Sequence, residues 1–184
     1  MKSIAFITGN ATKAMHLGQF LDFPIKHTKL DIPEVQSLNL EEVATEKARA
    51  AYKILGTPVL VEDTALTFEA LNGLPGPLVK WFLESIGNDG LTKLLLGYDN
   101  RNAVAETCFA LCDGSGVHLF EGTSLGKVAI HPKGDDGYGW DPVFIPEGSN
   151  LTWAEFDLAE QRGVSMRRLA IEKLQRYLEA NYKK

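Results

Sequence analysis

The first 63 residues alternate between strand-like and helix-like patterns. Short apolar runs at residues 2–8 and 25–30 predict strands, and amphipathic repeats at residues 12–21 and Leu40–Leu55 predict helices. The apolar run at residues 58–61 predicts a further buried strand. Strands that alternate with helices in this way predict an α/β fold.

The second half of the chain follows a different order. Two short helices are expected at residues 76–86 and 89–96, consecutive strands at 104–112, 117–120 and 124–130, a last strand at 143–145, and an amphipathic helix at 165–181. Consecutive strands favour antiparallel pairing. We therefore predict a mixed, twisted sheet that is flanked by helices.

Length and composition limit the class of protein. The chain has 184 residues, 45% of them hydrophobic, which suits a single domain over residues 1–184, or a main lobe with a smaller one. No apolar stretch approaches the roughly 18 residues that cross a bilayer, and the N-terminal apolar run is too short for a signal sequence. We expect a cytoplasmic protein without a membrane partner. The net charge of −5 argues against binding a nucleic-acid polymer.

The two cysteines, Cys108 and Cys112, fall in one predicted strand. Four residues of a strand span about 13 Å, which is too far for a disulfide. Neither cysteine has a nearby histidine or second cysteine pair, so core packing is the expected role for both.

Two adjacent carboxylates, Glu62 and Asp63, follow the predicted strand at residues 58–61 and precede Thr64. Ligands of open α/β sheets collect beyond the carboxyl ends of strands, so the pair indicates a divalent-cation site, with a solvated turn as the alternative. Glu34 supplies a third acid at a strand-to-loop junction, although an ordinary surface acid would look the same. Such a set suits Mg²⁺, which prefers one or two carboxylates completed by water and phosphates.

The loop between the first predicted strand and helix is a candidate anion site. It consists of Thr8, Gly9, Asn10, Ala11, Thr12 and Lys13. Backbone N–H groups at such a turn attract anions, and Lys13 adds a positive charge. The P-loop spacing is absent, and an ordinary helix cap with a solvated Lys13 would give the same pattern.

Two lysines stand in apolar surroundings. Lys47 shares a helical stripe with Val43 and Ala51, so it must snorkel, pair with an acid or bind an anion such as a phosphate. Lys80 lies within a strongly apolar predicted helix. Its side chain would either contact a phosphate or simply be exposed on the outer face of that helix.

Residues 137–142 combine glycines, aromatic residues and one acid. Tyr138 and Trp140 would stack on a nucleobase, and Asp141 would accept hydrogen bonds from its N–H groups. A glycine-rich turn whose aromatic rings cover the core is the alternative.

These segments, in this order, resemble the inosine triphosphate pyrophosphatase family, which acts on noncanonical purine nucleotides. The resemblance runs through nearly the whole chain and rests on Thr8-Gly9-Asn10-x-x-Lys13, Val61-Glu62-Asp63-Thr64, Leu74-Pro75-Gly76-Pro77, Lys80-Trp81-Phe82 and Gly139-Trp140-Asp141-Pro142. It implies two lobes around a central nucleotide-binding groove and a homodimer. It also implies Mg²⁺-dependent hydrolysis of nucleoside triphosphates such as ITP, dITP or XTP to the monophosphate and pyrophosphate.

The resemblance also implies a role for each matching position. Glu34 and Asp63 would bind the metal, and Asp63 would be the base toward the attacking water. Glu62 and Lys13 would be catalytic together with Asp63. The 8–13 loop would bind the phosphates, Lys47 and Lys80 would neutralise phosphate charge, and Glu62 and Thr64 would support the metal and the substrate. The residues that would hold the base are Tyr138, Gly139, Trp140 and Asp141.

The chain departs from the family's pattern at residues 160–167. Gln161 stands in place of a lysine and Met166 in place of a histidine, while Arg167 is retained and would donate to the purine 6-oxo group. Met166 has no N–H donor, and the loss of one hydrogen bond to the substrate costs about 1–3 kcal/mol. Alternatively, Met166 fills the core at the start of the last predicted helix. Two alternatives are a pyrophosphatase with shifted base specificity, for modified pyrimidines or other altered nucleotides, and a catalytically silent nucleotide-binding module.

Overall fold

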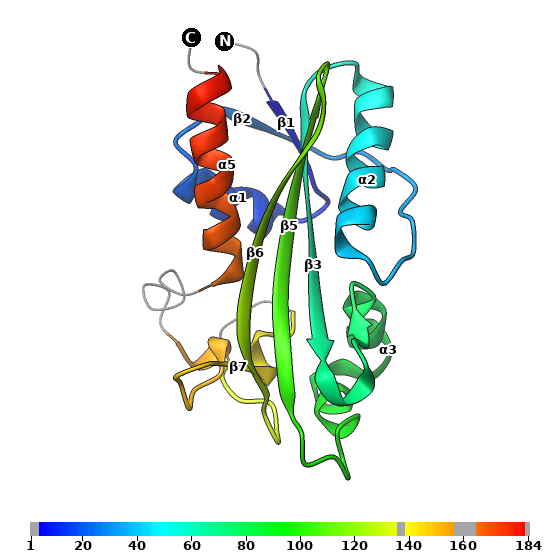
Figure 1. Cartoon of the computed structure of the whole chain (residues 1–184), viewed down its shortest axis with the longest axis vertical. Helices are drawn as coiled ribbons and strands as arrows, with labels where there is room; N and C mark the ends of the chain where they lie inside the picture. Colours follow the sequence, from blue (N-terminus) through cyan, green and yellow to red (C-terminus); the bar gives the residue numbers. More distant parts are fainter. Residues whose placement is uncertain (1–3, 136–138, 157–164, 183–184) are drawn as a thin grey trace. The chain divides into compact units, whose positions relative to one another are not determined.

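A computed structural model describes residues 4–135, 139–156 and 165–182 of the chain (Figure 1). The chain divides into two compact units. The first unit is formed by residues from 1–63, 107–122 and 167–184, and the second by residues from 64–106 and 123–166.

The strands form a mixed sheet. Their bounds are Ile4–Ile7 (β1), Ile25–Thr28 (β2), Val59–Phe68 (β3), Pro75–Gly76 (β4), Asn102–Asp113 (β5), Gly116–Val128 (β6) and Phe144–Pro146 (β7). Within the described residues their order is β2-β1-β3-β5-β6-β7, with β4 paired to β3. β1 pairs in parallel with β2 and β3, whereas β4 and β7 pair antiparallel with β3 and β6. The predicted mixed, twisted α/β sheet is therefore confirmed.

Helices cover both faces of the sheet in the first unit (Figure 1). They are α1 (Ala11–Phe20), α2 (Leu40–Leu55) and α5 (Met166–Tyr182). One core cluster joins Leu60 of β3 to apolar residues of α1 and α5, and another joins Val59 and Val61 to α2. Successive residues of a strand point to opposite faces, so α2 packs on one face and the other two helices on the opposite one.

α2 has the bounds that the sequence predicts. Asn39 caps it by accepting a 3.1 Å hydrogen bond from the backbone N–H of Glu42. Gly56 ends the helix with a φ of 64°, a conformation that favours glycine. This clear start and stop explain why its ends were predictable.

The second unit has its own core. Its helix α3 (Val79–Lys93) is bent at Gly87, where φ is 65° and ψ is −175°. Trp140, Phe144 and Trp153 pack there with ring centroids 4.5–5.9 Å apart. The described part of this unit also contains three single turns of 3-10 helix, at Glu69–Leu71, Asp141–Val143 and Trp153–Glu155.

Arg101 links segments of the second unit through backbone oxygens. Its guanidinium donates to the carbonyl groups of Thr92, Leu95, Val128 and Ala129 at 2.7–3.3 Å. Because every one of these acceptors is a main-chain atom, Arg101 has a structural role.

The structure corrects two predicted strands. β3 does not end at Val61 but continues to Phe68, so Glu62 and Asp63 lie inside a strand. The strands predicted at 117–120 and 124–130 form the single strand β6. Side chains keep alternating between exposed and buried from Glu121 to Leu125, which explains why the strand is not interrupted there.

The prediction for the helices at 76–86 and 89–96 also needs correction. Gly76 belongs to β4, and the helical residues form the bent helix α3. Gly87 separates its two parts, which accounts for the two helical patterns in the sequence.

Both cysteines pack in the core, as predicted. Cys108 is 0% and Cys112 5% exposed, and neither forms a disulfide. Burial, together with nearby carboxylates, raises the pKa of Cys108 to about 12, so this thiol is inert as a nucleophile at neutral pH. Among the described residues, no helix is both long and apolar enough to cross a membrane.

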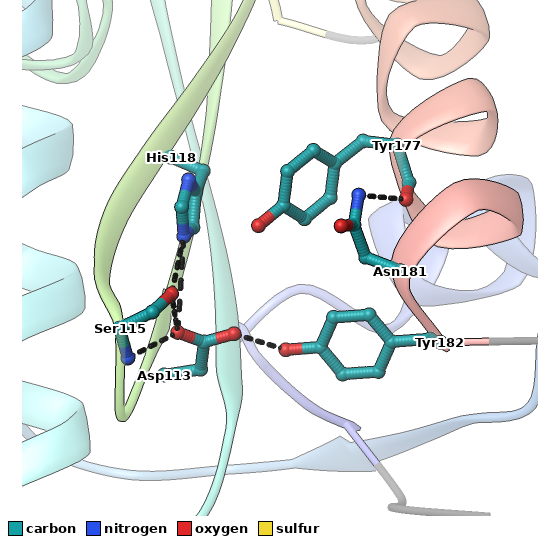
Figure 2. A network of polar contacts seen from close by, with 6 residues as sticks. All are labelled: Asp113, Ser115, His118, Tyr177, Asn181 and Tyr182. Carbon is teal, nitrogen blue, oxygen red and sulfur yellow. Dashed lines mark hydrogen bonds and ion pairs between the residues drawn. The ribbon is translucent and has the colours of Figure 1, made fainter. Parts of the chain in front are cut away.

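A polar network joins the β5–β6 turn to the end of α5 (Figure 2). Asp113 Oδ1 accepts hydrogen bonds from the backbone N–H and the hydroxyl of Ser115 at 2.8 and 2.7 Å, and Asp113 Oδ2 accepts one from the Tyr182 hydroxyl. His118 Nε2 lies 3.7 Å from the same carboxylate. Burial alone would raise the pKa of Asp113, but the bonds from Tyr182 and Ser115 lower it to about 2.

We expect Tyr182→Phe to lower the free energy of unfolding by about 1.5–3 kcal/mol at pH 7, because it removes a hydrogen bond to a charged acceptor. The pKa of Asp113 lies below its ordinary value of 3.8, so the bond contributes fully above about pH 4 and fades as the pH falls toward 2. Urea unfolding at pH 7 and pH 2.5 measures this, with the exposed Tyr98→Phe as the control. An equal loss at both pH values would contradict the assignment.

Candidate functional site

Lys47 lies between two carboxylates in the first unit. Its Nζ is 2.6 Å from Glu34 Oε1 and donates a 3.0 Å hydrogen bond to Asp63 Oδ1. The side chain of Lys47 is 13% exposed, that of Asp63 19% and that of Glu34 38%. The structure thus brings together three residues that the sequence singles out separately.

The position of Lys47 follows from helical spacing in α2. Val43, Lys47 and Ala51 are four residues apart and share one face. Val43 and Ala51 are buried, so Lys47 also faces inward, as predicted. Of the three expected outcomes, pairing with acids is the one that the structure contains.

Burial and charge act against each other at this cluster. Burial raises the pKa of Asp63, and the nearby ammonium groups of Lys47 and Lys13 offset only part of the rise. Burial would lower the pKa of Lys47, but Asp63 and Glu34 raise it overall. Lys47 is therefore charged at neutral pH, and Asp63 is a stronger base than an ordinary aspartate.

One oxygen of Asp63 has no partner among the described residues. Its Oδ2 is buried and accepts no hydrogen bond there. An unpartnered buried carboxylate oxygen is unfavourable by itself, but it is a suitable ligand for a cation. Glu34 and Asp63 fit Mg²⁺, which often takes two carboxylates and completes its shell with water and phosphates. The described residues contain no group of three or more His, Cys, Asp or Glu side chains placed to hold a metal.

The candidate phosphate loop connects β1 to α1, and Ala11 and Thr12 begin that helix. Asn10 Oδ1 accepts a 3.2 Å hydrogen bond from the backbone N–H of Lys13, so the helix cap considered from the sequence is present. A Cβ atom placed on Gly9 would have no described neighbour within 4 Å, which leaves room beside the loop.

Sequence reasoning missed one contact of this loop. From β2, His27 Nε2 donates a 2.9 Å hydrogen bond to the carbonyl oxygen of Thr8. A single histidine in a half-exposed strand carries no pattern that would have indicated this contact.

Glu62 forms a buried ion pair with Arg167 of α5. Arg167 Nε lies 2.7 Å from Glu62 Oε1, and Nη2 donates to Oε2 at 2.8 Å. The same Nη2 donates to the carbonyl oxygen of Lys13 at 2.9 Å. The Glu62 side chain is 1% exposed and that of Arg167 17%. One side chain therefore ties β3 to the first turn of α1.

The other predicted substrate residues that the structure describes lie in the second unit: Thr64, Lys80, Gly139, Trp140, Asp141 and Met166. Trp140 is 6% and Met166 7% exposed, and both belong to the core cluster of that unit. Lys80 is exposed, with its Nζ 5.4 Å from the ring centroid of Trp81. Tyr138 and Gln161 lie outside the described residues.

We expect Arg167→Ala to lower the free energy of unfolding by about 3–5 kcal/mol, because it leaves the buried Glu62 carboxylate without its cation. The exposed neighbour Arg168, which pairs with Glu172 on the helix surface, is the control, and Arg168→Ala should cost less than about 1 kcal/mol. Thermal and urea unfolding measure both. A small loss in Arg167→Ala would show that the ion pair does not hold the two elements together.

Comparisons with known proteins identify the family. The chain matches the Ham1 family over residues 4–177. An inosine triphosphate pyrophosphatase of Yarrowia lipolytica is 44% identical over 181 residues, which cover 96% of this chain and 95% of that protein.

Two solved structures are also similar. A HAM1 protein from Coxiella burnetii has a TM-score of 0.86 and 28% identity, and the match covers 98% of this chain and all of that one (100%). A nucleoside-triphosphatase, or dITP/XTP pyrophosphatase, from Mycobacterium abscessus has a TM-score of 0.71 and 28% identity, with 99% and 100% covered. Since the family match spans nearly the whole chain, as the sequence motifs predict, the protein belongs to the Ham1 family.

Proposed function

We propose that the protein hydrolyses noncanonical purine nucleoside triphosphates, such as ITP, dITP and XTP, to the monophosphate and pyrophosphate. The names of its relatives support this reaction. The observation that carries it is the cluster of Glu34, Lys47 and Asp63, which combines metal-type ligands, a base and a cation in one place.

Each residue of the proposed site in the first unit would have a chemical role in this reaction. Asp63, whose pKa is raised by burial, would accept the proton of the attacking water. Lys13 and Lys47 would neutralise phosphate charge as it develops, and the start of α1 would orient the phosphates. Glu34 and Asp63 would hold a Mg²⁺ ion, which polarises phosphate oxygens and activates water when it is bound.

The base-binding residues are proposed from the family resemblance. Gly139, Asp141 and Arg167 would contact the purine, with Tyr138 and Gln161 as further candidates, and Trp140, whose ring packs in the core, would support this segment from behind. Lys80 and Thr64 would assist the phosphates and the metal. We also propose a homodimer in the cytoplasm, and sedimentation analysis would test the dimer.

A shifted base preference is the second candidate function. Met166 is 7% exposed in an apolar cluster and has no donor for a purine. One lost hydrogen bond corresponds to a roughly ten- to hundredfold change in discrimination, which is enough to change the preferred base. Altered pyrimidine nucleotides therefore belong in the substrate panel.

A nucleotide panel tests the proposed reaction. The protein is incubated with Mg²⁺ and ITP, dITP, XTP, the four common nucleotides or altered pyrimidine nucleotides, and released pyrophosphate is measured. We expect the highest kcat/KM for ITP, dITP or XTP. Preference for an altered pyrimidine would favour the second candidate, and binding without release of pyrophosphate would indicate a silent module.

Asp63→Asn should abolish turnover and leave nucleotide affinity within about tenfold of the wild type. The substitution removes the charge of the proposed base and ligand but leaves the phosphate loop in place. Pyrophosphate release and equilibrium nucleotide binding are measured in parallel. Asp99→Asn, at an exposed position, is the matched control and should behave as the wild type. Turnover close to the wild type in Asp63→Asn would refute the role of Asp63.

Met166→Leu should leave the ratio of kcat/KM for ITP and GTP unchanged within about threefold. Leucine conserves the volume and apolar character of a core methionine, so the fold is maintained. The ratio is measured alongside thermal stability. A larger change in the ratio, in a variant as stable as the wild type, would mean that Met166 contacts the base.

A further inference from the structure

The contacts of Lys47 determine how a metal ion can enter the cluster. Its Nζ lies 2.6 Å from Glu34 Oε1 and 3.0 Å from Asp63 Oδ1. These two carboxylates are also the ones that fit Mg²⁺. An ammonium group and a divalent cation would therefore compete for the same two carboxylates.

The charges favour an exchange of cations. Without a metal, Lys47 neutralises one of the two negative charges of Glu34 and Asp63, and this pairing is important because the largely buried carboxylate of Asp63 is costly without a cation. A divalent ion neutralises both charges. It would also repel an ammonium group that stayed at contact distance.

The surroundings allow the exchange to take place. Asp63 Oδ2 is buried and has no hydrogen-bond partner among the described residues, so one ligand atom is already available. Glu34 lies between β2 and α2, outside regular secondary structure, and its side chain is 38% exposed. Lys47 carries its charge on a flexible four-carbon stem, so the ammonium group is able to move while α2 stays in place.

We propose that Lys47 is an exchangeable counterion: it holds Glu34 and Asp63 together before a metal binds, and the metal displaces its ammonium group toward the triphosphate. The inference rests on the proposed function, because it takes Glu34 and Asp63 as the metal ligands. It adds that one lysine alternates between two partners during each binding cycle.

Metal affinity in the absence of nucleotide tests the exchange. Lys47→Met keeps most of the side-chain stem and removes the competing charge, so Mn²⁺ should bind at least tenfold more tightly than to the wild type. Titration calorimetry or the electron paramagnetic resonance of free Mn²⁺ measures this. Lys53→Met, at an exposed position on the same helix, should bind Mn²⁺ as the wild type does. Unchanged or weaker binding by a folded Lys47→Met overturns the proposal.

A second measurement uses the wild-type chain and does not depend on the folding of a variant. Nuclear magnetic resonance of ¹⁵N-labelled lysine should show the Lys47 ammonium group protected from exchange with water by its two ion pairs. Saturating Mg²⁺ should shift this signal and increase its exchange rate. A Lys47 signal that Mg²⁺ leaves unchanged overturns the exchange.

The two proposals fail in distinguishable ways. If the wild type hydrolyses nucleotides while Mg²⁺ leaves the Lys47 signal unchanged, the exchange is wrong and the proposed function stands. If no nucleotide is hydrolysed and Glu34→Gln binds Mn²⁺ as tightly as the wild type, the proposed metal site is wrong and the exchange is rejected with it.

Discussion

The buried pair of Glu62 and Arg167 constrains how the first unit is assembled. The carboxylate is 1% exposed, and a buried charge without a partner is strongly unfavourable. Arg167 therefore has to approach β3 from the start of α5, and from there it also bonds the carbonyl oxygen of Lys13. A single guanidinium thus positions a strand, a helix and the candidate phosphate loop together.

Strand geometry assigns different partners to the two adjacent acids. Side chains alternate between the faces of a sheet, so Glu62 shares the face of Leu60, and Asp63 shares the face of Val61. The first face carries α1 and α5, and Arg167 comes from α5. The second face carries α2, which supplies Lys47. Glu62 is paired through both oxygens, whereas Asp63 keeps one oxygen without a described partner. The alternation therefore separates a structural acid from one that is available for chemistry.

The parts of the structure that were predictable from sequence depend on local patterns. The inward position of Lys47 follows from its spacing to Val43 and Ala51, because helical periodicity is a property of neighbouring residues. The burial of Glu62 does not follow from its neighbours, because its partner Arg167 is 105 residues away. For the same reason the end of β3 was misplaced: a pair of acids indicates a turn unless a distant cation allows one of them to be buried.

Charge balance explains how an acidic protein would bind a triphosphate at this cluster. Glu34, Glu62 and Asp63 face the cations Lys13, Lys47 and Arg167, so the group as a whole is close to neutral before any ligand binds. Lys47 and Arg167 are both engaged by carboxylates, and a triphosphate would meet little free positive charge. A divalent ion at Glu34 and Asp63 would change this balance, because it would add two positive charges and remove the reason for Lys47 to stay with the acids. Binding of metal and nucleotide would then be mutually favourable, and the net charge of −5 would present no obstacle to an anionic substrate.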